Sequence, residues 1–199
     1  MSKPKKSEIP QKNSEIVVNA SELRCVNGYY QWWANEKCLD VIINQLKTII
    51  SKLNQKNSKD PYVVDFNEIR DHLESRMDLS DEKLYCVYLG ISKTNVLHRL
   101  ISCHVMGKNK STLRKSISRI FSWNEGEVNE FIDNLLITYR YVDREFPLED
   151  EEEKLINKVE NGKRYFRLLN IDKNYFYRDK KCCRNENFTW ILEKKIRND

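Results

Sequence analysis

The chain has 199 residues, of which 40% are hydrophobic, 33% charged and 11% aromatic, and its formal net charge is +5. That length suits one domain or two small ones, and its aromatic content is too high for a disordered chain. No apolar run reaches the roughly 18–20 residues that a membrane-spanning helix requires. Residues 1–20 also lack the apolar stretch of a secretory signal. The sequence therefore predicts an intracellular protein, cytoplasmic or nuclear, that does not contact a membrane.

Residues 1–20 combine several lysines with two prolines and show no periodicity. We expect a disordered basic tail there. The first structured unit is predicted over residues 21–54, and it opens with an aromatic cluster, Tyr29, Tyr30, Trp32 and Trp33. Such a cluster near a helix start either anchors the chain in the core or forms a surface for a partner.

A helix is predicted over residues 36–54, because apolar residues recur there at intervals of three and four. Its apolar stripe can face the core or seat a partner helix. The polar segment 55–61 ends in Pro61 and predicts a linker. A second unit then spans residues 61–199. Three helices are expected within residues 92–138, with Ser92, Ser111 and a Ser122–Glu125 capping box at their starts.

The C-terminal part of the sequence favours β-structure. Segments 137–142, 163–171, 175–178 and 188–196 are rich in aromatic and β-branched residues, and a helix is expected over 151–160. The predicted fold class is α+β, a mainly helical body with a C-terminal antiparallel β-hairpin or meander. A winged-helix arrangement fits this order of elements.

Charge is distributed unevenly along the chain. Residues 141–160 hold eight acids, including the run 149–153, against three bases, whereas residues 161–199 hold eleven bases against five acids. Bases interleaved with aromatic rings can bind nucleic acid, because cations neutralise phosphates and rings stack on bases. A second basic set lies on the middle helix of residues 92–138. The candidate nucleic-acid-binding residues are Lys108, Lys110, Arg114, Lys115, Arg119, Arg167, Tyr177, Arg178, Lys180, Lys181 and Arg184.

The same charge pattern is consistent with two roles unrelated to nucleic acid. An antiparallel sheet with one solvated face needs polar alternate residues, and lysine and arginine commonly fill them. The acidic run at 149–153 can also neutralise the basic tail within the molecule.

The sequence shows no recognised catalytic motif. The five glycines form no phosphate-binding loop, and the three histidines have no nucleophile at motif spacing. The six cysteines lack the paired spacing of a zinc site. Cys38, Cys86 and Cys103 lie in apolar segments and are predicted to be buried free thiols. A thiol–imidazole pair that uses Cys103 is conceivable but unsupported. We therefore predict no catalytic residue, no bound metal and no cofactor.

The predicted function is a non-enzymatic, intracellular protein that binds nucleic acid, with DNA and RNA equally open. The alternative is a protein–protein interaction module, an adaptor, complex subunit or inhibitor. It would use Tyr29, Tyr30, Trp32 and Trp33 or the helix at 36–54 to contact its partner.

Overall fold

A five-stranded antiparallel sheet forms the centre of the computed structural model, with strand order β1-β5-β2-β4-β3. The structure describes residues 7–19, 27–56, 65–108, 110–142, 146–156, 158–161, 163–165 and 167–170. The strands are β1 (Ser7–Gln11), β2 (Gly28–Asn35), β3 (Ser75–Met77), β4 (Lys83–Ser92) and β5 (Leu136–Tyr141). A small second sheet pairs β6 (Val159–Glu160) with β7 (Lys163–Arg164).

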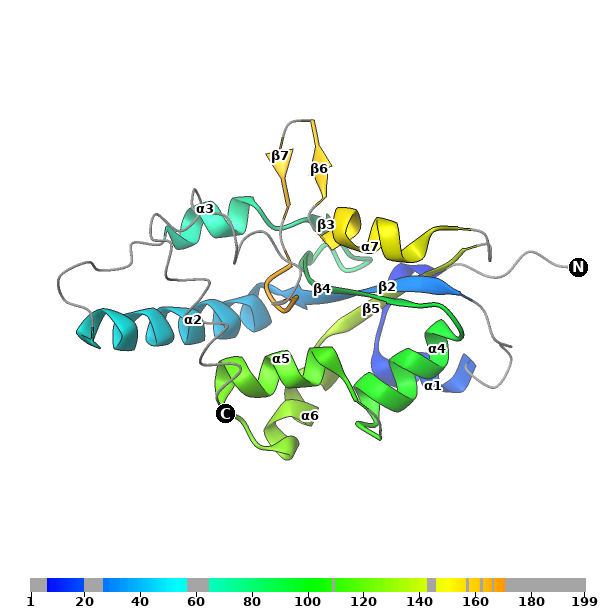
Figure 1. The fold of residues 1–199 in the computed structure, drawn as a ribbon, viewed down its shortest axis with the longest axis horizontal. Helices are drawn as coiled ribbons and strands as arrows, with labels where there is room; N and C mark the ends of the chain where they lie inside the picture. The colour runs from blue at the N-terminus through cyan, green and yellow to red at the C-terminus, as the bar shows by residue number, and fades with distance from the viewer. Residues whose placement is uncertain are drawn as a thin grey trace, which may run out of the picture.

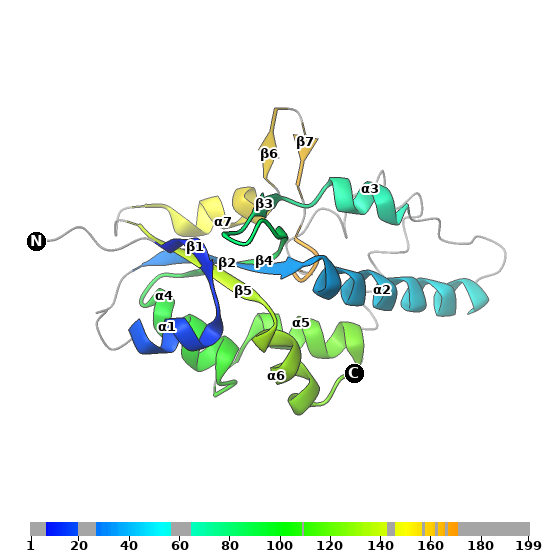
Figure 2. The same cartoon turned by 180° about the vertical axis from the view of Figure 1, so that it is seen from behind.

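Helices cover both faces of the central sheet (Figure 1). They are α1 (Asn13–Asn19), α2 (Glu36–Lys56), α3 (Phe66–Asp71), α4 (Val96–His98), the π-helix η2 (Arg99–Val105), α5 (Thr112–Phe121), α6 (Glu125–Asp133) and α7 (Leu148–Ile156). Helices α1, α4, α5 and α6 lie on one side of the sheet and α7 on the other, as Figure 2 also shows. Among the described residues, no helix has the length and apolar character to cross a membrane.

Strand β2 lies inside the sheet, hydrogen-bonded to β4 on one edge and to β5 on the other. Its side chains are buried on both faces. Tyr30 and Trp32 belong to the main core, whereas Trp33 packs with Leu84 and Cys86 in a second cluster. The aromatic cluster of the sequence is therefore a core strand, and this burial removes Tyr30, Trp32 and Trp33 from any surface for a protein partner.

The prediction of a mainly helical body with C-terminal β-structure was wrong. The main sheet is built from the N-terminal and central parts of the chain, so a winged helix does not describe it. The reason is burial on both faces. Strands β2 and β4 lack the polar–apolar alternation of a half-solvated strand and consist of nearly continuous apolar runs, which a sequence pattern cannot distinguish from other buried segments.

The predicted N-terminal tail and domain boundary also differ from the structure. Residues 7–19 form β1 and α1, and the side-chain amide of Asn13 donates to the backbone carbonyl of Ile132 at 3.0 Å. Strands β2 and β4 lie on either side of the proposed linker in sequence, yet they pair in one sheet. The two predicted units therefore share a core.

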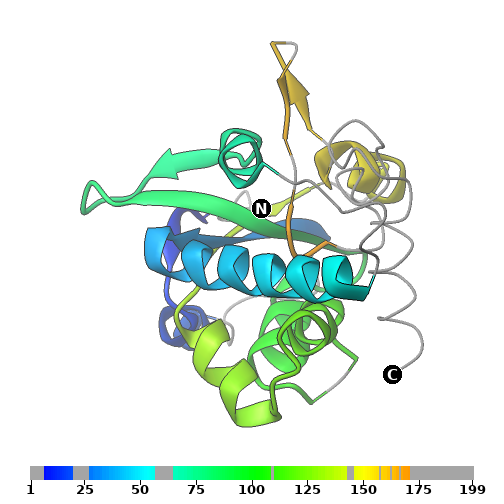
Figure 3. The ribbon, with the colours of Figure 1, turned by 90° about the vertical axis from the view of Figure 1, so that its left-hand side faces the viewer.

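Helix α2 confirms the helix predicted over 36–54. In sequence it lies between β2 and β4, the strands that pair in the sheet. In space, Figure 3 shows it between α3 and the helical layer of α5 and α6. Arg70 of α3 forms ion pairs with Glu36 and Asp40 on one side of α2. The side chain of Gln45 donates to the carbonyl of Ile120 in α5 at 3.0 Å. These contacts fix α2 between the two layers.

The helix starts within 92–138 match the prediction in part. Ser111 caps α5 as predicted, accepting from the Arg114 amide. Ser122 instead ends α5 in the left-handed region, with φ of 56°, and the capping box of α6 is formed by Asn124 and Glu127. Strand β5 agrees with the strand predicted over 137–142. The strands predicted over 175–178 and 188–196 lie outside the described residues.

Candidate active site

The π-helix η2 brings an arginine and a histidine side chain to one face of the sheet. Asn95 caps the short α4, which runs directly into η2. The amide of Met106 then donates to the carbonyl of Ile101, five residues earlier, at 2.8 Å. Because a π-turn is wider than an α-turn, residues five apart lie on the same side of the helix. Arg99 and His104 are such a pair, and both interact with Tyr30 of β2.

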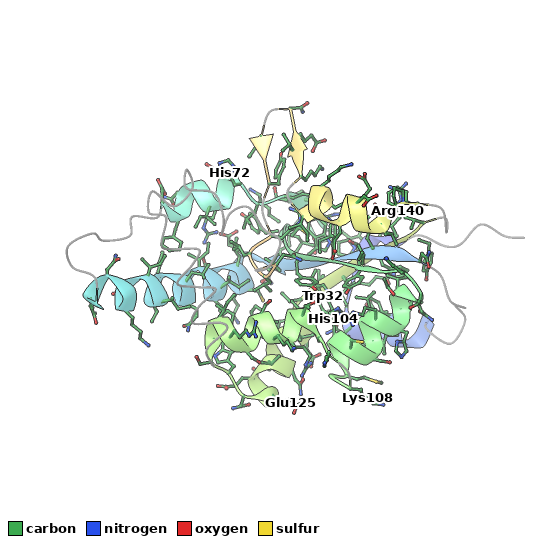
Figure 4. All side chains as sticks on the ribbon, viewed as in Figure 1. Trp32, His72, His104, Lys108, Glu125 and Arg140 are labelled. Carbon is green, nitrogen blue, oxygen red and sulfur yellow. The ribbon has the colours of Figure 1, made fainter. Side chains whose placement is uncertain are left out.

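A hydrogen-bonded chain links β2 to α5 through His104. The Tyr30 hydroxyl lies 2.5 Å from Nε2 of His104, and Nδ1 of the same ring lies 2.6 Å from Oγ of Ser111. Ser111 Oγ in turn accepts the Arg114 amide at 3.0 Å. Figure 4 shows His104 beside Trp32, between the sheet and the helices below it. The imidazole is fully buried, so its position is fixed by these partners.

Burial and nearby charge determine the protonation of this chain. Desolvation raises the pKa of Tyr30 well above its ordinary value, although the nearby guanidinium of Arg99 acts in the opposite direction. Desolvation, together with the charges of Arg99 and Arg114, lowers the pKa of His104 to about 3. At neutral pH the site therefore contains a protonated phenol beside a neutral imidazole.

Two glycines allow close approach to strand β2 or from it: Gly90 of β4 lies against Tyr30 of β2, and Gly28 of β2 lies against β5. A Cβ at Gly90 would lie 2.4 Å from the ring of Tyr30, and a Cβ at Gly28 would lie 2.3 Å from the carbonyl oxygen of Arg140. Next to Gly90, the backbone of Leu89 donates to and accepts from the side chain of Asn170, each at 2.7 Å. The segment 167–170 is therefore hydrogen-bonded to β4 beside Gly90.

A basic groove lies over α5 and α6 and is lined in part by Ser111. It has a volume of about 710 Å³. Its lining residues are Gly107, Lys110, Ser111, Arg114, Lys115, Ser118, Arg119, Ser122, Trp123, Glu125 and Val128. Lys110, Lys115 and Arg119 are exposed, and none of them forms an ion pair with an acid within the described part of the chain. The groove therefore offers several unpaired cations to an anionic polymer.

Arg114 holds the groove together. Its guanidinium donates to the carbonyls of His104 and Val105 at 2.9 and 3.2 Å, at the C-terminal end of η2, and also to Asn129 of α6. Only 11% of its side chain is exposed, and Glu125 lies 3.8 Å away. A Cβ at Gly107 would lie 3.1 Å from this guanidinium. Arg114 thus joins η2, α5 and α6.

The structure gives the predicted site residues three different positions. Lys110, Arg114, Lys115 and Arg119 line one groove, and Lys108 lies exposed at the end of η2, in the lower layer of Figure 4. Arg167 is 1% exposed and forms an ion pair with Glu74, so its guanidinium does not reach the surface. Tyr177, Arg178, Lys180, Lys181 and Arg184 lie outside the described residues.

The sequence prediction missed Tyr30, Tyr88, Arg99 and His104 as site residues. Tyr88 of β4 lies near His104, with ring centroids 5.9 Å apart, and its hydroxyl lies 2.5 Å from that of Thr112. A signal was present in the pair of short segments Gly-Tyr-Tyr at 28–30 and Tyr-Leu-Gly at 88–90. Each joins a glycine to tyrosines within an apolar run.

No group of three or more His, Cys, Asp or Glu side chains is placed to share a metal ion within the described part of the chain. Glu125 is the carboxylate that lines the basic groove, and its side chain is 78% exposed. Mg²⁺ usually keeps several waters and can be held by only one or two carboxylates. Glu125 fits such a minimal site.

Comparison with known families identifies this arrangement. The family model described as the GIY-YIG catalytic domain matches residues 28–187, and the chain belongs to this family. Gly28-Tyr29-Tyr30 in β2 and Tyr88-Leu89-Gly90 in β4 resemble the two motifs of that name, with Tyr29 and Leu89 in place of isoleucine. No curated protein and no solved structure matches the chain.

Membership corrects the functional prediction. GIY-YIG catalytic domains are nuclease domains, so the prediction of a non-enzymatic protein was wrong. The broader prediction that the partner is nucleic acid is confirmed, with nucleic acid now the substrate class. The candidate catalytic residues escaped notice because they come from β2, β4 and η2, which are distant in sequence and meet only in the fold.

Proposed function

We propose that this protein is an endonuclease that hydrolyses a phosphodiester bond of nucleic acid bound along the α5–α6 groove. Tyr30 and His104 transfer the proton of the attacking water. The observation that carries this proposal is the 2.5 Å contact between the Tyr30 hydroxyl and His104 Nε2, in a family of nucleases. A phenol is a weak base alone, but it can accept one proton while it donates another.

The proton moves in two coupled steps. The attacking water gives a proton to the Tyr30 oxygen, while the Tyr30 hydroxyl proton passes to Nε2 of His104. The water oxygen forms a bond to phosphorus, the bond from phosphorus to the leaving oxygen breaks, and that oxygen takes a proton from solvent. His104 then returns its proton to solvent through the same chain. Tyr30 is 1% exposed, so its hydroxyl must become accessible to water when the substrate binds, and the nearby guanidinium of Arg99 then turns towards the phosphate.

Substrate binding makes this transfer easier. The low pKa of His104 is partly caused by the positive charges of Arg99 and Arg114. A phosphate beside Arg99 compensates that charge, and an opposite charge favours the protonated imidazole. Arg99 also stabilises the charge that develops on the phosphate oxygens in the transition state. The bound substrate therefore raises the basicity of the group that accepts the proton.

Bound Mg²⁺ would polarise the phosphate and stabilise its developing charge, with Glu125 as the protein ligand. Exposed bases around the groove, Lys110, Lys115 and Arg119, contact neighbouring phosphates without reading the sequence. The proposed substrate is therefore recognised mainly through its backbone. Both DNA and RNA are to be tested.

The test compares two variants of β2, each of which lacks one tyrosine hydroxyl. Tyr30→Phe removes the buried hydroxyl, whereas Tyr29→Phe removes a hydroxyl that accepts from Arg140 at 3.3 Å, on the opposite side of the sheet. Cleavage of end-labelled duplex DNA, single-stranded DNA and RNA is followed in Mg²⁺. Loss of acid–base catalysis commonly costs about 10²–10⁴-fold in rate. We expect a loss of that size for Tyr30→Phe and little change for Tyr29→Phe. Equal rates in both folded variants would refute the proton-transfer role.

A further inference from the structure

We infer that Ser111 is a positioning residue that sets the tautomer of His104. Its oxygen accepts the Nδ1–H proton, so that a bare Nε2 faces the hydroxyl of Tyr30. The catalytic consequence rests on the proposed function. The tautomer itself is a property of the free protein and is measured without substrate.

The burial of Tyr30 determines where its proton goes. Its hydroxyl is 2.5 Å from His104 Nε2, and its side chain is 1% exposed. The nearby guanidinium of Arg99 has donors only. Nε2, at 2.5 Å, is placed to accept the hydroxyl proton of Tyr30. A buried hydroxyl that donates to nothing is costly, so Tyr30 donates and Nε2 accepts.

The ring proton of His104 then lies on the other side of the imidazole. A neutral imidazole that accepts at Nε2 carries its proton on Nδ1. Ser111 Oγ lies 2.6 Å from Nδ1 and is placed to accept that proton. A serine oxygen can accept two hydrogen bonds, and the second comes from the Arg114 amide at 3.0 Å. Ser111 lines the groove, so its own proton can be donated to solvent or to a phosphate oxygen there.

The opposite tautomer, with the ring proton on Nε2, leaves the hydroxyl proton of Tyr30 without this acceptor. If Ser111 donated to Nδ1, then Nε2–H would point at Tyr30, and the proton of Tyr30 would be left in the core. Tyr30 would also lose the acceptor that its proton needs during hydrolysis. The N-cap bond to the Arg114 amide fixes the position of Ser111 Oγ. The start of α5 therefore orients the imidazole, much as a third group orients the base in a catalytic triad.

The experiment detects ring protonation directly. Full-length protein with ¹⁵N-labelled histidine is studied by long-range ¹H–¹⁵N NMR near neutral pH, and His104 is identified by the signals lost in His104→Gln. We expect a protonated Nδ1 and a bare Nε2. A wild-type ring with its proton on Nε2 would overturn the inference.

Three substitutions separate helix capping from tautomer control. Ser111→Thr and Ser111→Asp keep both the cap and an acceptor for Nδ1–H, whereas Ser111→Gly keeps most of the capping preference but removes the acceptor. We expect the Nδ1–H tautomer in the first two and a mixture of tautomers in Ser111→Gly. Circular dichroism and unfolding midpoints establish that each variant is folded.

The cleavage rate is a second readout, and it distinguishes failure of the proposed function from failure of the role of Ser111. We expect Ser111→Gly to lose about tenfold or more in cleavage rate and Ser111→Thr to recover it, since a misplaced base forfeits part of acid–base catalysis. A wild-type tautomer in Ser111→Gly would refute the role of Ser111. Absence of cleavage by the wild-type protein would refute the proposed function alone, because the NMR result does not depend on it.

Discussion

The ring of Tyr30 in β2 lies against the backbone of Gly90 in β4, so closely that a Cβ at position 90 would come within 2.4 Å of the ring carbon Cζ. These residues lie in the segments that resemble the two motifs of the family name. In the antiparallel pairing of β2 with β4, Tyr30 lies opposite Gly90. The glycine therefore provides the space in which the phenol ring lies. The hydroxyl of the same ring is then held at His104.

We predict that Gly90→Ala displaces Tyr30 and lowers both stability and cleavage. The atoms that the new methyl group meets belong to a ring that is 1% exposed, so they cannot move aside as a flexible side chain would. Overpacking of this kind costs roughly 1–3 kcal/mol. Chemical denaturation measures the free energy of unfolding, and cleavage of labelled DNA measures the rate.

Gly126→Ala in α6 is the matched control. A Cβ there would lie 3.2 Å from Oδ1 of Asn124, an exposed side chain that needs to shift only slightly while it still caps α6. Alanine is also the better helix former, so we expect equal or slightly higher stability. Equal effects of Gly90→Ala and Gly126→Ala would contradict the specific packing of Gly90 against Tyr30.

Stability should fall as the pH drops below about 6.5, and His104 should account for much of that loss. Its pKa is about 3 in the folded protein, against an ordinary value of 6.5. Between these values the unfolded chain binds a proton at His104 and the folded protein does not, so acid favours unfolding. A shift of this size corresponds to a contribution on the order of a few kcal/mol.

Urea denaturation between pH 7 and pH 4 tests this in wild type, His104→Gln and His98→Gln. His98 lies on α4 with its side chain exposed. His104→Gln should be less stable at pH 7 but lose less stability on acidification, whereas His98→Gln should follow the wild type. Parallel pH profiles for wild type and His104→Gln would show that His104 titrates normally.

The sequence allowed parts of this fold to be predicted because they follow local rules. Helix α2 carries an apolar stripe at helical spacing, Ser111 is a favourable N-cap, and β5 is rich in β-branched and aromatic residues. The basic set on α5 was recognised because its members are near neighbours on one helix. Local periodicity was therefore sufficient for these elements.

The sheet and the catalytic group could not be predicted in that way. Strand β2 is buried on both faces by partners that lie far along the chain, so its own pattern carries no strand signal. His104 lies five residues after Arg99, a spacing that places two residues on different sides of an α-helix. A π-turn brings them together, and it is rare enough that the spacing does not suggest it.

Arg114 should behave as a structural residue, in contrast to its neighbour Lys115. Its guanidinium satisfies the carbonyls of His104 and Val105 and reaches Asn129, whereas the Lys115 side chain is exposed. Removing a partner from buried acceptors costs about 1–3 kcal/mol, and an exposed substitution usually stays within about 0.5 kcal/mol. Arg114→Ala should therefore lower the free energy of unfolding clearly, and Lys115→Ala should leave it nearly unchanged. Comparable losses of stability in the two variants would show that Arg114 does not stabilise the packing of η2, α5 and α6.

The exposed bases of the groove should set the salt dependence of binding. Lys110, Lys115 and Arg119 line the groove and are exposed, and Lys108 is exposed just after η2. Each phosphate contact that is lost should reduce the slope of log Kd against log salt by about 0.9 for duplex DNA. Fluorescence anisotropy of a labelled duplex, measured in Ca²⁺ to limit cleavage, should show this reduction for Lys115→Ala and for Arg119→Ala. Lys163→Ala on β7, which lies on the opposite side of the sheet, should keep the wild-type slope (Figure 1). If Lys163→Ala reduced the slope as much as Lys115→Ala, binding would depend on total charge, and the groove would lose its role as the nucleic-acid surface.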